Sequence, residues 1–132
     1  MKCIIAGSRN ITKYKFIEDA IKESGFNITE IISGKAKGVD LLGEEYAINN
    51  NISIKKFPAK WDELKLLPCK IKYNKYGKPY NVLAGRNRNE EMLNYILPDG
   101  GLIAIWDGKS TGTSHMISIS RNKNIKVYIK YI

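Results

Sequence analysis

The sequence is poor in the residues from which metal sites and disulfide frameworks are built. Its 132 residues contain one histidine and two cysteines, Cys3 and Cys69. The cysteines form neither a CxxC pair nor a Cys/His cluster, so we expect no zinc or other metal site and no disulfide. No apolar run approaches the roughly 20 residues that a membrane-spanning helix needs. The short apolar run near the N-terminus is typical of a strand and not of a signal peptide, and we therefore expect a cytoplasmic protein without a membrane partner.

Two familiar phosphate-binding motifs are also absent. The segment 34–40 (GKAKGVD) is not a P-loop, because no GK[ST] closes it. No GxGxxG follows the first apolar run, so the dinucleotide fingerprint fails as well. We expect no tightly held cofactor, and any phosphate site must use glycine-rich turns of another kind.

The charge is strongly one-sided, with 22 Lys and Arg against 13 Asp and Glu, or +9. Such an excess favours a polyanionic partner, either a nucleic acid or a phosphorylated ligand. An A+T-rich coding sequence would give the same wealth of Lys, Ile and Asn without any such partner. We expect nucleic-acid binding to be weak or non-specific at most.

Apolar, β-branched segments alternate along the chain with segments of helical periodicity. The expected strands are 2–6, 27–32, 52–57, 101–106 and 125–129, and the expected helices are 14–24, 38–50, 85–97 and 113–121. This order predicts an α/β fold, a Rossmann-like three-layer sandwich with a mostly parallel five-stranded sheet. In the second helix we expect Val39, Leu41, Leu42, Tyr46 and Ala47 to face the core.

A lysine-rich stretch at about 62–83 interrupts the alternation. It carries Lys65, Lys70, Lys72, Lys75 and Lys78, and no acid between Glu63 and Glu90. We predict a solvent-facing insertion without regular structure, within a single domain of residues 1–132.

Three glycine-bearing turns follow predicted strands. They are Gly7-Ser8-Arg9, the segment 33–40 and the segment 107–113. The carboxyl ends of parallel strands share one edge of the sheet, where ligands of open α/β folds bind. Glycine lets backbone N–H groups approach a phosphate, and the following helix adds the positive end of its dipole. One such turn is usually only a tight connection, but three on one edge favour a ligand site, with countercharge from Arg9, Lys35, Lys37 and Lys109.

The segment 84–92 (AGRNRNEEM) adds two arginines, Arg86 and Arg88, at a predicted helix start. There they can fork onto phosphate oxygens, unless the segment is only a solvated helix N-terminus. Trp61 and Trp106 are candidates to stack on a base, although Trp106 ends a core strand and packing explains it equally well.

Taken together, these motifs resemble the SLOG superfamily. The set comprises GSR (7–9), SGKAKGVDLLGEEYA (33–47), FPAKW (57–61), AGRNRNEEM (84–92) and LIAIWDGKSTGTSHMI (102–117). SLOG proteins are a Rossmann-like group that includes DprA/Smf and the LOG phosphoribohydrolases. The small stand-alone YspA/YpsA-related branch, common in bacteria and their phages, is the most similar. The resemblance implies ligand-binding roles for Gly7, Ser8, Arg9, Gly34, Gly38, Asp40, Arg88, Asn89, Gly108, Gly112 and Thr113.

The resemblance to LOG enzymes breaks at one catalytic position. Those enzymes cut an N-glycosidic bond with an Arg in R-[KN]-x-x-M and a Glu closing PGGxGTxxE. Residues 88–92 fit the first motif, but Met116 stands where the second requires Glu. Glycosidic cleavage needs a carboxylate, so we predict binding without turnover. Asp40, Arg88 and His115 are the candidates for a substitute. Asp40 is equally explained as a helix first-turn acid, and His115 as a surface or subunit-contact residue.

Three functions follow as hypotheses. The leading one is a protein that binds a nucleotide or an ADP-ribose-like derivative, as a sensor or as a sponge that sequesters the signal, such as a phage protein directed against host nucleotide signalling. The alternatives are a LOG-type hydrolase with an altered acid, and a DprA-related nucleic-acid binder whose Tyr73, Tyr76 and Tyr80 stack on bases.

We also expect a homo-oligomer, in the simplest case a dimer. SLOG relatives imply one, and Met116, Ile117 and Ile119 of the last predicted helix carry more apolar bulk than a small monomer is expected to cover.

Overall fold

The structure is a computed structural model that describes residues 1–65 and 69–132. Residues 66–68, inside the predicted insertion, lie outside the described residues. The elements are β1 (Lys2–Gly7), α1 (Tyr14–Ser24), β2 (Glu30–Ser33), α2 (Val39–Asn49), β3 (Ser53–Lys56), β4 (Ile71–Tyr73), β5 (Pro79–Asn81), α3 (Ala84–Ile96), β6 (Gly101–Trp106), α4 (Thr111–Asn122) and β7 (Lys126–Tyr131).

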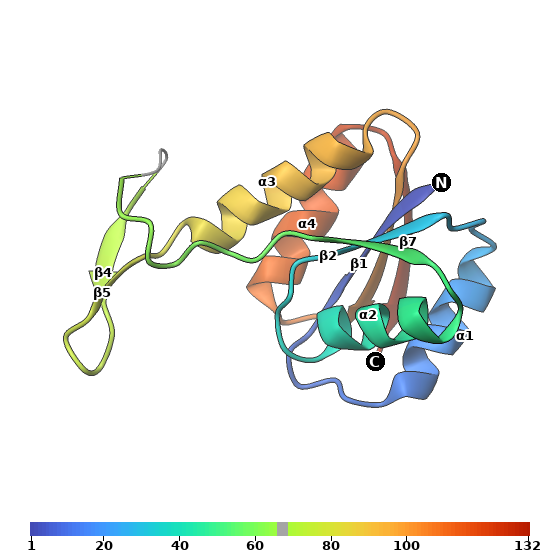
Figure 1. Cartoon of the computed structure of the whole chain (residues 1–132), viewed down its shortest axis with the longest axis horizontal. Coiled ribbons are helices and arrows are strands. Elements are labelled where there is room, and N and C mark those ends of the chain that lie inside the picture. The colour runs from blue at the N-terminus through green and yellow to red at the C-terminus, as the bar shows by residue number, and fades with distance from the viewer. Residues whose placement is uncertain (66–68) are drawn as a thin grey trace.

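Five strands form one parallel sheet in the order β3-β2-β1-β6-β7, with helices on both faces (Figure 1). Alternation along β1 divides the core. Cys3 and Ile5 join a cluster with α1 and α2, whereas Ile4 and Ala6 join a cluster with α3 and α4. The predicted Rossmann-like three-layer sandwich is therefore confirmed, and every strand of this sheet is parallel.

The inner face of α2 differs from the predicted one. Val39, Gly43 and Ala47 are buried at intervals of four residues, whereas Leu41 is 43% exposed. A Cβ atom at Gly43 would lie 2.9 Å from the Cβ of Ile5. The helix thus packs through a small residue in close contact with β1, and this contact turns Leu41 toward solvent. The prediction that Leu41 faces the core is wrong.

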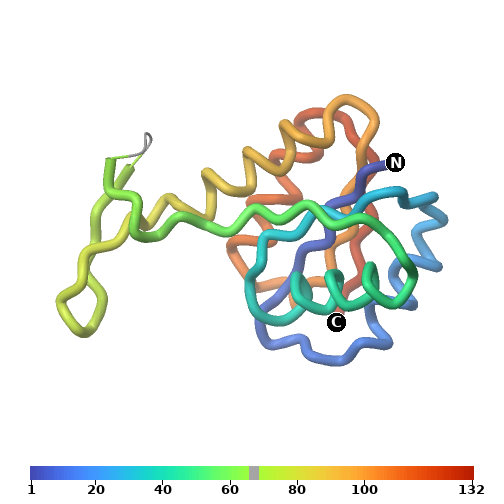
Figure 2. The backbone as a smooth tube through the Cα atoms, viewed as in Figure 1, coloured from blue at the N-terminus to red at the C-terminus, as the bar shows by residue number. Residues whose placement is uncertain are grey.

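The chain reverses its direction of travel across the sheet between β1 and β6. From β1 it moves outward to β2 and β3, and after the insertion it returns to β6 on the other side of β1 (Figure 2). The loops that leave β1 and β6 therefore diverge. This is the switch point at which open parallel sheets form a crevice.

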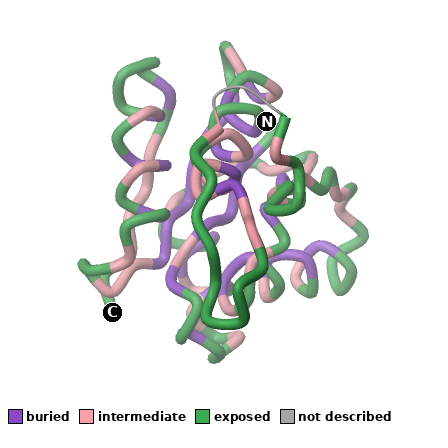
Figure 3. Tube along the Cα trace, turned by 90° about the vertical axis from the view of Figure 1, so that its left-hand side faces the viewer, coloured by how far each residue is buried: buried purple, intermediate pink, exposed green. Residues whose placement is uncertain are grey.

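The insertion contains regular structure, contrary to the prediction. Strands β4 and β5 pair antiparallel, with Lys72 opposite Tyr80, and Asn74 and Gly77 form the turn between them. We call the described residues of this insertion, 62–65 and 69–83, the arm. It projects from the sandwich (Figure 1) and is exposed along most of its described length (Figure 3). Each of these strands has only three residues, IKY and PYN, which is too short for a periodic hydrophobic pattern to indicate a strand.

The apolar face of α4 is covered within the chain. Met116 is 1% and Ile117 4% exposed, and Ile119 packs against the same cluster. The surplus of apolar surface that suggested a dimer is thus absent from this helix, and that argument is wrong. A homo-oligomer stays a prediction from the resemblance alone. None of the helices in the described part of the chain combines the length and apolarity that crossing a bilayer requires.

Candidate functional site

A pocket of about 720 Å³ lies at the switch point between β1 and β6. Its walls come from the end of β1, the starts of α2, α3 and α4, and the arm. Of the predicted site residues, those that line it are Gly7, Arg9, Asp40, Arg88, Asn89, Gly112, Thr113 and His115. Segments more than 100 residues apart thus meet in one cavity, whose volume is in the range of ligand sites, about 300–1,000 Å³.

The other predicted site residues do not line the pocket. They are Ser8, Gly34, Lys35, Gly38, Gly108 and Lys109. Ser8 is fully buried, and its Oγ accepts the Asp107 N–H at 3.1 Å and lies 3.0 Å from the Ser110 Oγ. Gly38 has φ +78°, and a Cβ there would come within 2.6 Å of the Arg9 carbonyl. Both residues hold the turns that shape the pocket.

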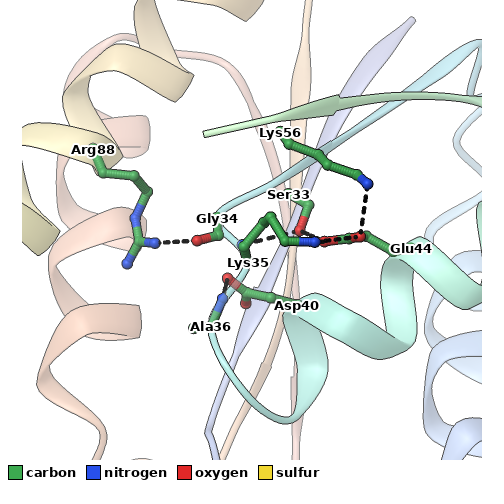
Figure 4. Close-up of polar contacts among 8 residues, drawn as sticks. All are labelled: Ser33, Gly34, Lys35, Ala36, Asp40, Glu44, Lys56 and Arg88. Atoms are coloured by element: carbon green, nitrogen blue, oxygen red, sulfur yellow. Dashed lines mark hydrogen bonds and ion pairs between the residues drawn. The ribbon is translucent and has the colours of Figure 1, made fainter. Parts of the chain in front are cut away.

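The loop after β2 is held by the buried carboxylate of Glu44 (Figure 4). Ser33 Oγ donates to it at 2.6 Å and Lys35 Nζ at 3.1 Å, while Lys56 Nζ lies at 3.7 Å. Burial raises the Glu44 pKa, but the hydrogen bonds from Ser33 and Lys35 outweigh it, and the pKa lies below its ordinary value. The charge of Lys35 is therefore taken up by Glu44 and is not directed into the pocket.

Gly34 brings a cation and an acid together. Arg88 Nη1 donates to the Gly34 carbonyl (Figure 4). A Cβ at residue 34 would lie 2.7 Å from Arg88 Nη1 and 2.8 Å from Asp40 Oδ2. Glycine is needed here because the two side chains pass over the backbone where a larger residue would stand.

Asp40 is 5% exposed, and its Oδ2 accepts the Ala36 N–H at 3.3 Å. Burial raises the pKa of this carboxyl to about 6, although the charges of Arg88 and Arg9 and the Ala36 N–H act in the opposite direction. Burial also lowers the pKa of Arg88, against the attraction of Asp40. The pocket thus holds a carboxyl group that changes protonation near neutral pH, beside a guanidinium.

Asn89 joins α3 to α4. Its Nδ2 lies 3.2 Å from the Gly112 carbonyl and 3.1 Å from His115 Nδ1, and its Oδ1 accepts Arg88 Nε at 3.1 Å. Burial, and next the charge of Arg86, lower the His115 pKa, so its imidazole is neutral at pH 7. Because Nδ1 faces an amide donor, we assign the ring proton to Nε2.

The start of α4 offers backbone donors to the pocket. Ser110, Thr111, Gly112 and Thr113 line it, and Ser110 makes no capping hydrogen bond through its side chain. The first N–H groups of a helix have no partner within it and carry the positive end of its dipole. Asp107 shapes this turn by accepting the N–H groups of Ser110 and Lys109, which lower its pKa to about 2.

Several lining residues were not predicted, among them Asn10, Lys70, Lys72, Val82 and Leu83. The last four belong to the arm, and no local signal tied that segment to the sheet edge. Trp61, at the base of the arm, also lines the pocket.

Trp106 does not line the pocket. Its Nε1 donates to the Ser110 carbonyl at 3.0 Å, as the packing alternative expects. Met116, where LOG enzymes place Glu, lies in the pocket wall. Among the described residues, no three His, Cys, Asp or Glu side chains gather into a group that could hold a metal ion.

Comparison with known protein families finds a similarity in the first part of the chain. A family model described as "YAcAr: YspA, cpYpsA-related SLOG family" matches residues 1–63. No curated protein and no solved structure gives a significant match. The matched residues run from β1 through β3 to Glu63 and include Arg9, Gly34 and Asp40. This match supports membership of the SLOG superfamily, and the parallel sheet that the rest of the chain completes agrees with the Rossmann-like fold of that group.

Proposed function

We propose that the protein binds a nucleotide or a nucleotide-derived, ADP-ribose-like molecule in this pocket and holds it without turnover. The observation that carries the proposal is the placing of arginine. The chain has four arginines, and three of them, Arg9, Arg86 and Arg88, line the pocket. In a chain whose positive charge is mostly lysine, a coding bias does not explain this concentration.

Arginine suits phosphate because its planar guanidinium donates two parallel hydrogen bonds. The unpartnered N–H groups at the start of α4 supply further donors at the same cavity. Both features favour a phosphorylated ligand over an uncharged one.

The pocket also has an apolar part suited to a base or ribose face. Ala6, Met92 and Met116 contribute to its wall, and the methionines are each 1% exposed. Trp61 is 37% exposed and can stack on a ring. A site with apolar walls and a few directed polar groups is typical of small-molecule binding. A free-standing binder of this kind fits a sensor, or a sponge of the type a phage would direct against host nucleotide signalling.

A second candidate, N-glycosidic hydrolysis, is favoured by one observation. Asp40 is a buried pocket carboxyl with a pKa of about 6, as a general acid requires. We place it second because Asp107, the other acid in the pocket wall, is held as an anion by its own turn, and Met116 cannot handle a proton.

Binding is tested by calorimetric titration of AMP and ADP-ribose into the wild type, Arg88→Ala and Arg121→Ala. Arg121 is the fourth arginine, exposed and absent from the pocket wall, so its variant removes the same charge elsewhere. We expect Arg88→Ala to weaken binding about 10- to 100-fold, as the loss of charged hydrogen bonds implies, and Arg121→Ala less than about twofold. Equal effects of both variants, or a wild type that binds no nucleotide, would contradict the proposal.

Turnover is tested by incubating the protein with nucleoside monophosphates, NAD and ADP-ribose, followed by denaturation and chromatography. Recovery of intact ligand supports a sensor or sponge. Multiple-turnover release of free base that disappears in Asp40→Asn or His115→Ala would establish the hydrolase instead.

A further inference from the structure

The described residues of the arm add no apolar side chain to the core of the sandwich. Among the described residues, neither core cluster contains a residue of 62–83. The same segment nevertheless supplies Lys70, Lys72, Val82 and Leu83 to the pocket wall. Its place in the structure is therefore better explained by the pocket than by folding.

The base of the arm is built around a buried polar side chain. Asn81 is fully buried, and its Oδ1 accepts the N–H groups of Lys70 at 3.1 Å and Leu83 at 3.0 Å. The Val82 N–H donates to the Lys70 carbonyl at 2.9 Å, and the Asn81 N–H to the Trp61 carbonyl at 2.8 Å. These bonds fix the Lys70 backbone from both sides, at the edge of the pocket.

Lys70 and Lys72 lie two residues apart along an extended segment, so their side chains leave the same face, which is the face toward the pocket. In the described part of the chain neither forms an ion pair, whereas Lys78 is paired with Asp62 at 3.4 Å. Two unneutralised ammonium groups therefore face one cavity.

These lysines belong to a different wall from Arg9 and Arg88. Arg9 and Arg88 lie with Asp40 at the switch point, whereas the arm stands away from the sandwich (Figure 1). The indole of Trp61 lies between the two walls, with Cη2 3.3 Å from where a Cβ at Gly85 would stand. The pocket thus has cationic groups on two walls and an aromatic ring at the start of α3.

We propose that the arm forms a second subsite, which binds the distal part of a two-part nucleotide. The ligand class is a nucleoside 5′-phosphate that continues through a second phosphate to a further sugar or nucleoside. The first phosphate lies with Arg9, Arg88 and the start of α4, and the distal part lies against Lys70, Lys72 and Trp61. This inference rests on the proposed function, since it assigns a ligand class to the same pocket.

The test compares two probes that share one half, AMP and ADP-ribose, on two matched double variants. Lys70→Ala/Lys72→Ala removes the lysines in the pocket wall. Lys65→Ala/Lys75→Ala removes the same charge from exposed arm positions outside it. We expect the first variant to weaken ADP-ribose binding at least about tenfold and AMP binding less than about twofold. We expect the second to change either affinity less than about twofold.

Each other result overturns the subsite. Unchanged ADP-ribose binding in Lys70→Ala/Lys72→Ala would show that the arm does not touch the ligand. An equal loss for AMP and ADP-ribose, or an equal loss in both variants, would show diffuse charge attraction. Binding of a single-stranded oligonucleotide more tightly than ADP-ribose, weakened by both variants, would make the arm a nucleic-acid surface. In all these cases the wild type still binds AMP, so the proposed function survives; if it binds neither probe, both proposals fail.

Discussion

The sandwich and the arm form two walls of one pocket by different means. The sandwich wall follows from topology, because parallel strands and a reversal of strand order bring Arg9, Asp40 and Thr113 to one edge. The arm wall depends on a hairpin of two three-residue strands, anchored by hydrogen bonds around Asn81.

This difference separates the affinity of the site for a nucleotide from its selectivity among nucleotides. The sandwich wall is tied to the packed core, so a change there affects both ligand and fold. The arm wall is tied to a few polar contacts, so its residues can vary without cost to the core. We expect the sandwich to determine whether a nucleotide binds, and the arm to determine which one.

Substitution at Gly34 tests the sandwich wall and has the largest expected effect. In Gly34→Val the new side chain occupies the space of Arg88 Nη1 and Asp40 Oδ2, which lie 2.7 and 2.8 Å from the Cβ position. Because both atoms are at the ends of side chains, they can move away. We expect a native circular dichroism spectrum, but affinities for AMP and ADP-ribose that are lower by more than about 100-fold. This loss is larger than the loss of one charged hydrogen bond would cause. Gly34→Ala, with a smaller intrusion, should lie between the wild type and Gly34→Val. Full affinity in Gly34→Val would remove Gly34, Asp40 and Arg88 from the site.

The buried carboxyl of Asp40 gives the sandwich wall a pH dependence. Its pKa of about 6 in the fold exceeds the ordinary value of 3.8, so the folded protein holds a proton that the unfolded chain releases. The resulting stability is present at low pH and is lost as pH rises from about 4 to about 6, by about 2–3 kcal/mol. The Asp40→Asn variant should not show this loss. The difference in free energy of unfolding between the variant and the wild type should therefore shift in favour of the variant by about 2–3 kcal/mol between pH 4 and pH 7. Urea unfolding of the ligand-free protein measures it, with Glu45→Gln on the exposed side of α2 as control. Parallel pH profiles for the wild type and Asp40→Asn would contradict it.

Excision of the arm has the smallest expected effect on the fold. The Asn81 N–H donates to the Trp61 carbonyl at 2.8 Å, so a two-residue Asn-Gly turn can join these two residues in place of residues 62–80. The core clusters lose no described residue, and we expect the unfolding temperature to fall by no more than about 4 °C, equivalent to about 1 kcal/mol. A thermal scan measures this change. Unfolding more than about 10 °C lower would mean that the arm supports the sandwich, and the contrast between the two walls would fail.

Much of the site was predictable because its determinants are local. Gly7, Arg9, Asp40, Arg88 and Thr113 each lie at the end of a strand, just after one, or in the first turns of a helix, and the order of elements brings those positions to one edge. The role of Ser8 was not predictable, because its partners Asp107 and Ser110 are about a hundred residues away in the sequence. The same holds for Lys35, whose charge is taken up by a glutamate on the next helix.

By itself, the sequence determined the five strands of the parallel sheet and the four helices, because hydrophobic periodicity and glycine turns act over a few residues. Only the tertiary structure decided that Gly43 packs on Ile5 and exposes Leu41, that α4 is covered within its own chain, and that the arm lines the pocket. Each of these depends on which surfaces meet in space. Such contacts are set by packing across the whole fold and leave no periodic signal in the segments that make them.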